Sequence, residues 1–158
     1  LQDKKPIAIR IPSNGVIHTS DKVDEVYSYE SKYKVTHKGS KVAVIAAGSF
    51  YQKGENVEKI LAEKGIDATL INPRYLNEVD ATTLDSLKAN HNLVVTLEDG
   101  CKDGGFGERV ASYFSASDMK VLVGGVKKDL YDRFDVHQLL SDNRLLDEQI
   151  VEDILEII

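Results

Sequence analysis

The sequence contains no tryptophan, a single methionine and a single cysteine, Cys101. One cysteine forms no intrachain disulfide and no cysteine-based zinc site. Its scarcity is typical of a reducing, cytoplasmic compartment. No apolar run approaches the roughly 18–20 residues that cross a bilayer, so a membrane is not expected as a partner. The 20 basic residues are outnumbered by 26 acidic ones, which argues against nucleic acid, because binding to phosphates needs a basic face.

The chain begins at Leu1 rather than at a methionine, and a β-prone run over residues 7–11 follows almost at once. Such a start, with no signal peptide behind it, is expected of a fragment of a longer protein. The 158 residues are enough for one domain with a short appendage. A domain of this size buries about 70% of its unfolded surface, so it needs no covalent cross-links.

Apolar runs alternate with helical patterns from residue 42 onward. Residues 42–47 and 93–97 are continuous apolar runs, as expected of strands that are covered on both faces. Residues 68–71 and 121–123 predict two further parallel strands. Helices are predicted at 49–64, from Asp80 through Leu87, at 108–116, near 136–141 and at 147–158. Ser49, Asp80 and Asp147 are the predicted N-caps, and Gly65 ends the first helix.

Repeated strand–helix units with short connections predict an α/β fold with three α/β/α layers and a mostly parallel sheet of about five strands. One strand, residues 33–36, precedes these units. The turn at Lys38-Gly39-Ser40 predicts a hairpin, in which this first strand runs antiparallel to residues 42–47.

The most glycine-rich segment is residues 98–107, EDGCKDGGFG. Glycines between a strand and a helix allow backbone N–H groups to bind a phosphate. Neither the P-loop pattern nor G-x-G-x-x-G is present, since Val110 occupies the third glycine position. Three acidic residues would also repel an anion. The favoured interpretation is a tight connection with close helix–sheet packing.

No set of side chains completes a catalytic site. Cys101 lies beside Lys102, but no particular histidine is specified as its base. Ser49 lacks the G-x-S-x-G context of a hydrolase nucleophile. The histidines are widely spaced and expected at the surface: His18, His37, His91 and His137. We therefore assign no catalytic, cofactor-binding or metal-ligating residue in these 158 residues.

Arg74 is the candidate substrate-binding residue. It follows the predicted strand 68–71, at the carboxyl end, where ligands of open α/β sheets bind. Its guanidinium offers a planar fork that matches a phosphate or a carboxylate. The position predicts contact with an anionic ligand, and the alternative is a surface ion pair.

Four segments, in this order, resemble the C-terminal domain of the transketolase-like thiamine diphosphate enzymes: KVAVIAAGSF, INPRYLNEVDATTLDSL, NLVVTLEDGCKDGGFGERV and VLVGGVKKDLYDRF. The resemblance is strongest to the 1-deoxy-D-xylulose-5-phosphate synthase branch. It implies that residues 1–30 are the tail of a preceding pyrimidine-binding domain with a linker. Residues 31–158 would then be the transketolase C-terminal-like domain.

The resemblance also implies a function. The chain would be the structural, dimerisation and substrate-channel domain of a homodimeric transferase. That synthase condenses pyruvate with glyceraldehyde 3-phosphate, with loss of CO₂, in isoprenoid biosynthesis. Thiamine diphosphate and Mg²⁺ would be bound by the preceding domains, so the isolated fragment is expected to be inactive. Arg74 matches the family arginine near the acceptor phosphate, whereas Ser13 replaces a second such arginine and leaves the acceptor open.

Two alternatives remain. A transketolase or the β chain of a 2-oxoacid dehydrogenase would differ in its upstream domains and in its donor substrate. A free-standing, non-catalytic α/β module for dimerisation belongs to another class, and the size of the natural gene product would distinguish it from a synthase.

Overall fold

The computed structural model describes residues 6, 8, 9, 11, 15 and 32–158. The predicted strand at 7–11 falls partly outside them, and its described members lie in no regular element. Ser13 and residues 16–30, which belong to the expected tail and linker at 1–30, lie outside the described residues.

Strands and helices alternate along most of the described chain. The strands are β1 (Tyr33–His37), β2 (Lys41–Ala46), β3 (Thr69–Pro73), β4 (His91–Cys101) and β5 (Lys120–Val126). The helices are α1 (Tyr51–Glu63), α2 (Ala81–Leu87), α3 (Phe106–Phe114), α4 (Val136–Asp142) and α5 (Asp147–Ile157), with a short 3-10 turn, η1 (Gly48–Phe50), before α1. No helix in the described part of the chain is long and apolar enough to span a membrane.

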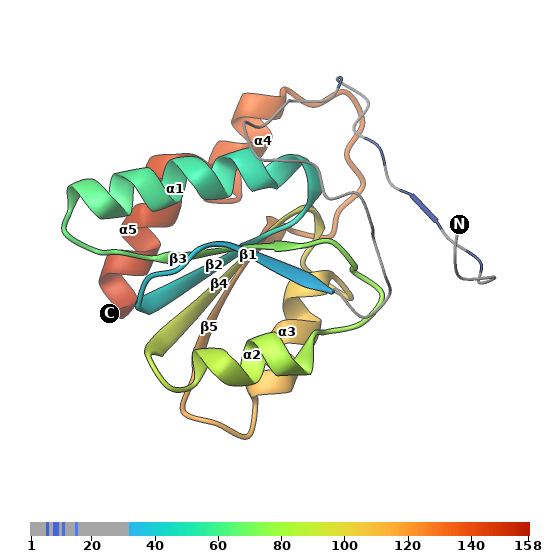
Figure 1. Ribbon diagram of the computed structural model, residues 1–158. Coiled ribbons are helices and arrows are strands. Elements are labelled where there is room, and N and C mark those ends of the chain that lie inside the picture. The colour runs from blue at the N-terminus through green and yellow to red at the C-terminus, as the bar shows by residue number, and fades with distance from the viewer. Residues whose placement is uncertain (1–5, 7, 10, 12–14, 16–31) are drawn as a thin grey trace.

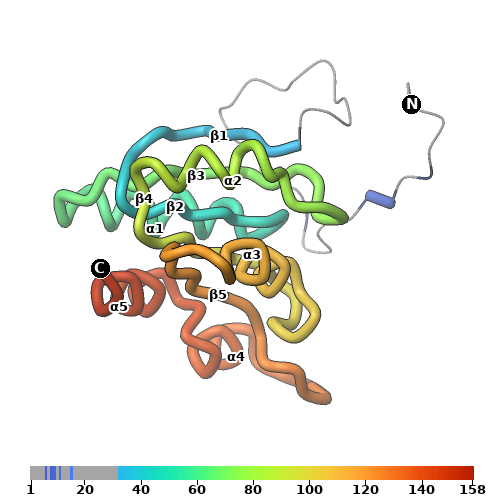
Figure 2. Tube along the Cα trace, turned by 90° about the horizontal axis from the view of Figure 1, so that it is seen from below, coloured from blue at the N-terminus to red at the C-terminus, as the bar shows by residue number. Residues whose placement is uncertain are grey.

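The strands form one sheet in the order β1-β3-β2-β4-β5. β2, β3, β4 and β5 are parallel, and β1 is antiparallel to its neighbour. Helices α1 and α5 cover one face, and α2 and α3 cover the other (Figure 1). Figure 2 shows the sheet from β1 to β5, with α4 beyond the β5 edge. The predicted three-layer α/β/α fold, with a mostly parallel sheet and one antiparallel strand, is therefore confirmed.

The two central strands carry the core because both of their faces are covered. Side chains of successive strand residues point to opposite faces, so β2 contributes to two apolar clusters. The cluster under α1 and α5 includes Val42, Val44, Val57, Leu61, Val95, Ile150 and Ile154. The cluster under α2 and α3 includes Ala43, Ile45, Leu84, Val94, Val110 and Phe114. The apolar runs identified in the sequence are thus the middle of the sheet.

The first strand has a different partner from the one that the hairpin pattern predicts. β1 pairs antiparallel with β3, and Val35 lies opposite Ile71. The β1–β2 connection passes over the start of β3: the backbone nitrogen of Ser40 donates to the carbonyl of Asp67 at 2.7 Å. A Cβ atom on Gly39 would collide with the Asp67 backbone. The glycine is therefore required by a crossing of two chain segments, and the predicted hairpin between β1 and β2 is wrong.

Two of the predicted helix signals are confirmed. Asp80 caps α2 and accepts a hydrogen bond from the backbone nitrogen of Thr83 at 3.2 Å. Gly65 follows α1 with φ +80°, the left-handed conformation that glycine adopts most easily at a helix end. Both signals depend on residues adjacent in sequence.

The other two N-cap predictions are wrong. α1 begins at Tyr51 after η1, and the hydroxyl of Ser49 donates to Asp99 instead of capping a helix. Leu146 is the N-cap of α5, and Asp147 is its first residue. The Asp147 carboxylate accepts hydrogen bonds from two side chains of α1, as described below. In both cases a distant partner competes for the polar side chain.

Candidate functional site

The four parallel strands bring their carboxyl ends to one edge of the sheet. β2 leads through α1 to β3 on one side, whereas β4 leads through α3 to β5 on the other. The two connections therefore lead to opposite sides of the sheet, and the strand order reverses between the adjacent parallel strands β2 and β4. In open α/β sheets this point, outside the carboxyl ends, is where ligands bind.

The reversal point is bridged by the protein's own side chains. Ser49, after β2, donates its hydroxyl to the Asp99 carboxylate near the end of β4, at 2.9 Å. Two residues earlier on the β2 side, a backbone bond joins the same two segments: the nitrogen of Ala47 donates to the carbonyl of Leu97 at 2.8 Å. These two bonds tie the connections that would otherwise flank a ligand.

The amino end of α3 holds an internal anion. β4 continues four residues beyond its predicted end and includes Glu98, the first residue of the glycine-rich segment. The carboxylate accepts hydrogen bonds from the backbone nitrogen of Phe106 at 3.2 Å and of Gly107 at 2.9 Å. Glu98 is only 8% exposed. The N–H groups that would bind a phosphate are therefore used by Glu98, in agreement with the structural interpretation of this segment.

Two glycines of the segment are explained by the same packing. A Cβ on Gly105 would lie 2.6 Å from Oε1 of Glu98. A Cβ on Gly107 would lie 2.5 Å from both Oγ1 of Thr96 and Cγ1 of Val123. Glycine is thus needed so that the carboxylate reaches α3 and so that α3 approaches the sheet closely.

Arg74 lies at the same edge, directly after β3, and is half-buried. Its backbone nitrogen donates to the carbonyl of Asn72 at 3.0 Å. The following segment is held at two points. Arg109 of α3 donates to the carbonyl of Leu76 at 2.7 Å, and Asp80 caps α2. Arg74 is therefore the first residue of a β3–α2 connection that is fixed by contacts with α3 and by the cap of α2.

Cys101 ends β4 opposite Val126 and is exposed. In the described part of the chain no hydrogen bond links its thiol to a histidine. The described residues therefore offer no histidine in hydrogen-bond contact that could act as base for a nucleophilic thiolate.

His91 is one of two histidines whose surroundings the sequence did not predict. Its Nδ1 atom lies 3.1 Å from the carbonyl of Leu87, and its Nε2 atom lies 2.8 Å from Oγ1 of Thr69. The Thr69 oxygen in turn accepts from the backbone nitrogen of Gly39 at 2.9 Å. A neutral ring that donates from Nδ1 satisfies all three groups. Burial lowers the pKa of His91, which favours that neutral form.

His37 is the second histidine whose surroundings the sequence did not predict. The remaining described histidine, His137, is exposed on α4, as expected. The ring of His37 lies between two carboxylates, those of Glu58 and Asp67. These residues are 21 and 30 positions away along the chain, so no local spacing pattern reveals the cluster.

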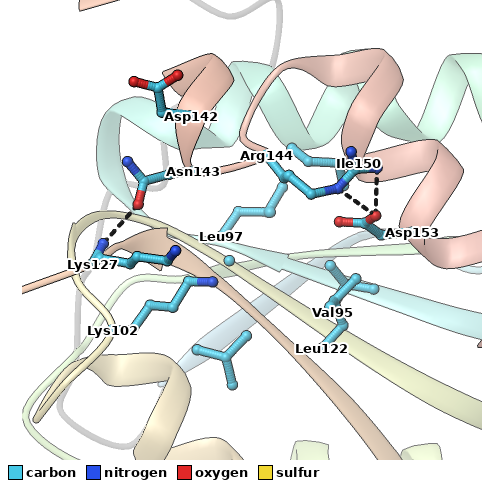
Figure 3. Close-up of a pocket in the computed structure, with 12 residues that line it drawn as sticks. Val95, Leu97, Lys102, Leu122, Lys127, Asp142, Asn143, Arg144, Ile150 and Asp153 are labelled. Carbon is cyan, nitrogen blue, oxygen red and sulfur yellow. Dashed lines mark hydrogen bonds and ion pairs between the residues drawn. The ribbon is translucent and has the colours of Figure 1, made fainter. Parts of the chain in front are cut away.

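A cavity of about 190 Å³ opens between β4, β5 and the α4–α5 connection. Figure 3 shows Lys102 and Lys127 at one end and Arg144 turned toward Asp153. Arg144 is already paired, at 2.6 Å from Asp153, and the hydrogen bond with Asp153 raises its pKa. The cavity is smaller than the roughly 300–1,000 Å³ of typical small-molecule sites, so it does not have the size of a cofactor pocket.

Comparison of the sequence with known families identifies the family to which this domain belongs. Residues 31–141 match the family described as "Transketolase, C-terminal domain", which is more than half of the chain. The chain therefore belongs to the transketolase C-terminal domain family.

Three curated relatives carry the name 1-deoxy-D-xylulose-5-phosphate synthase. The protein from Clostridium beijerinckii is 34% identical over 116 residues, 73% of this chain and 18% of that protein. Those from Clostridium tetani and Saccharopolyspora erythraea are 30% and 34% identical, over 99% and 98% of this chain and 25% and 24% of their own lengths. The chain thus spans about a fifth to a quarter of the relatives it matches.

A solved structure described as a split-gene transketolase, an inactive β4 tetramer, has the same fold. It superposes with a TM-score of 0.72 at 24% identity and covers 84% of this chain and 43% of that one. At this identity the likeness supports the fold alone.

Proposed function

We propose that this chain is the C-terminal domain of a 1-deoxy-D-xylulose-5-phosphate synthase, a transferase that condenses pyruvate with glyceraldehyde 3-phosphate and releases CO₂. The observation that carries the proposal is the match to a relative of that name over 99% of this chain, but only 25% of the relative. A catalytic site would then need domains beyond these residues. The domain boundary is part of the proposal, with residues 1–30 as the tail of a pyrimidine-binding domain and its linker.

Within this domain, we propose Arg74 as a contact to the phosphate of the acceptor substrate. Support comes from its position: it is half-buried, directly after β3, at the edge where the carboxyl ends of the parallel strands meet. A planar guanidinium binds a phosphate through two parallel N–H···O bonds. The protein's role at this point is to orient the acceptor.

The described residues do not fit thiamine diphosphate. The backbone N–H groups at the start of α3 bind Glu98 rather than a pyrophosphate, and the cavity beside Arg144 is too small for a cofactor. We therefore place thiamine diphosphate and Mg²⁺ in the preceding domains of a longer polypeptide. The cofactor supplies the electron sink for decarboxylation, and no step of that chemistry is assigned to residues of this domain.

The proposed assembly is a cytoplasmic homodimer of the complete chain. Its support is an exposed apolar stretch between β5 and α4, where Leu130 is 99% exposed and Phe134 is 53% exposed. The rings of Tyr131 and Phe134 meet edge to face, with centroids 6.0 Å apart. Neighbouring exposed apolar side chains are typical of surfaces that contact further protein.

The test uses the complete natural polypeptide with thiamine diphosphate and Mg²⁺. It is supplied with pyruvate, with and without glyceraldehyde 3-phosphate, while CO₂ and deoxyxylulose phosphate are followed. CO₂ release that depends on the acceptor, with formation of that product, supports the proposal. Ketol transfer from a ketose phosphate without use of pyruvate would assign the chain to a transketolase instead. If the natural polypeptide is no larger than this domain and shows neither activity, the chain is the non-catalytic module instead.

A further inference from the structure

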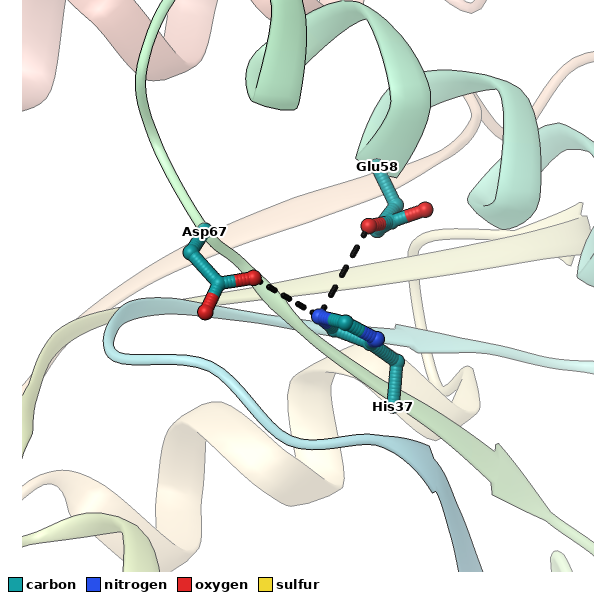
Figure 4. A group of neighbouring side chains, drawn as sticks. All are labelled: His37, Glu58 and Asp67. Carbon is teal, nitrogen blue, oxygen red and sulfur yellow. Dashed lines mark hydrogen bonds and ion pairs between the residues drawn. The ribbon is translucent and has the colours of Figure 1, made fainter.

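The opposite edge of the sheet carries a cluster of three ionisable side chains from three elements. His37 is the last residue of β1, Glu58 lies on α1, and Asp67 precedes β3. β1 is antiparallel to its neighbour, so its end lies at the amino edge of the parallel strands, away from Arg74. Figure 4 shows both carboxylates directed at the same ring nitrogen.

The distances suit a small cation. Nε2 of His37 lies 2.7 Å from Oδ1 of Asp67 and 3.8 Å from Oε1 of Glu58, and the three atoms lie within 4.8 Å of one another. A tetrahedral zinc ion with ligands at about 2.1 Å holds those ligands roughly 3.4 Å apart. The two observed separations lie on either side of that value, and the third, between the two carboxylates, is no more than 4.8 Å. The cluster therefore has about the size of such a site.

The charges also favour a divalent ion. Two carboxylates face one nitrogen that donates at most a single proton, and in the described residues neither carboxylate side chain has another hydrogen-bond partner. A dication with two carboxylates and a neutral imidazole gives a site with no net charge. An imidazole nitrogen with carboxylate oxygens suits zinc, whereas Mg²⁺ requires an octahedron of oxygens.

The backbone holds these ligands in place before any ion binds. The carbonyl of Asp67 accepts from Ser40 at 2.7 Å, and Gly39 donates to Thr69 at 2.9 Å. These bonds fasten the β1–β2 connection, which directly follows His37, against the segment that carries Asp67. Glu58 is placed by α1, whose buried face packs on the sheet.

We propose that His37, Glu58 and Asp67 form a zinc-binding site at the amino edge of the sheet, with water as the fourth ligand. The site lies away from Arg74 and requires none of the chemistry proposed for the carboxyl edge. A structural or regulatory ion is the role that this position allows, since it ties β1, α1 and the start of β3 together.

The test measures Zn²⁺ bound by the complete natural polypeptide at equilibrium, with Mg²⁺ in excess to fill sites that prefer it. His37→Gln and Glu58→Gln should each lose one equivalent, or weaken it by at least about tenfold, because changes even in groups that only support a ligand cost about that much. His137→Gln is the matched control, because that exposed histidine lies on α4, outside the cluster. It should bind as the unaltered protein does.

Cobalt provides a second readout that is independent of stoichiometry. Co²⁺ in a tetrahedral site has visible absorption bands, which should appear in the unaltered protein and in His137→Gln but be lost in His37→Gln. Circular dichroism checks that each variant is folded. If His37→Gln and Glu58→Gln bind the same number of Zn²⁺ ions, with the same affinity, as the unaltered protein, the cluster is an ion pair only and the proposal fails.

Discussion

The carboxylate of Glu98 lies 2.9 Å from the backbone nitrogen of Gly107, so a side chain of β4 accepts a hydrogen bond from the first turn of α3. A second bond, from the nitrogen of Phe106, joins the other carboxylate oxygen. The positive end of a helix dipole favours such a negative group. A segment whose glycines resemble a phosphate loop thus serves an internal carboxylate.

Replacing Glu98 by alanine should destabilise the fold. Two buried N–H groups would lose a charged acceptor, which costs about 2–3 kcal/mol of the free energy of unfolding. Urea unfolding measures the change. Asp103→Ala is the control, since this exposed neighbour in the same segment has no such bonds and should change stability by less than about 0.5 kcal/mol. Equal effects of both changes would contradict the role assigned to Glu98.

A link between α1 and α5 gives a second prediction. Oδ1 of Asp147 lies 2.6 Å from Nζ of Lys53, and its Oδ2 accepts from Asn56 at 2.8 Å. The Lys53 and Asp147 side chains are only 16% and 21% exposed, so water screens the pair less than at an open surface. Asp147→Ala should lower the free energy of unfolding by about 1–2 kcal/mol.

Glu148→Ala is the matched control for Asp147, because both acidic residues lie in the first turn of α5, whereas the hydrogen bonds to Lys53 and Asn56 of α1 are made by Asp147. The helix-dipole contribution is then common to both variants. A double-mutant cycle of Asp147→Ala with Lys53→Ala isolates the pair, and a coupling energy near zero would show that the contact stabilises nothing.

The neutral His91 ring predicts a pH dependence. Burial lowers its pKa below the ordinary value of 6.5, so the unfolded chain binds this proton more readily than the folded chain does. The stability it contributes is present above pH 6.5 and is lost as the pH falls through the folded pKa. Relative to His91→Gln, the unaltered protein should lose stability by at most about 1.4 kcal/mol per pH unit over that window.

Comparison with the variant is necessary because His37 acts in the opposite sense. The hydrogen bond with Asp67 raises the pKa of His37, so its contribution is present below pH 6.5 and is lost as the pH rises through its folded pKa. Urea midpoints are measured near pH 8 and near pH 5, with a chelator present to exclude metal ions. Parallel curves for His91→Gln and the unaltered protein would remove His91 as the cause.

For Arg74, the proposed acceptor contact is tested by steady-state kinetics of the complete polypeptide, assayed as the proposed synthase with both proposed substrates. Arg74→Ala should raise KM for glyceraldehyde 3-phosphate by roughly 10- to 150-fold, the cost of one charged bidentate contact, and leave KM for pyruvate nearly unchanged. Arg74→Lys should recover part of the loss, because an ammonium keeps the charge but not the fork. Lys59→Ala removes one exposed positive charge on α1 and controls for net charge. Equal effects on both substrates would remove Arg74 from the acceptor site.

The α/β fold was predictable because its strongest signals are local. Continuous apolar runs identify β2 and β4 as strands covered on both faces, and the cap at Asp80 and the glycine at residue 65 depend on neighbours a few positions away. Hydrophobic periodicity and backbone preference depend on residues a few positions apart along the chain, so both can be recognised in a single sequence.

Pairing and side-chain partners were decided only by the tertiary structure. β1 joins β3 because the β1–β2 connection crosses the segment at Asp67, and no local pattern distinguishes that edge from β2. Ser49 was predicted as a cap but bonds with Asp99, 50 positions away. A polar side chain satisfies its hydrogen bonds with whichever group folding brings within reach.

The carboxyl and amino edges of the sheet show the same contrast between what the sequence predicts and what only tertiary packing determines. The sequence alone determined that Arg74 follows a strand at its carboxyl end, because the order of elements along a chain is visible in its letters. Only the tertiary structure brought Glu98 under α3 and gathered Glu58 and Asp67 around His37. Those contacts join separate elements, and their geometry depends on how sheet and helices pack, which spacing along the chain does not encode.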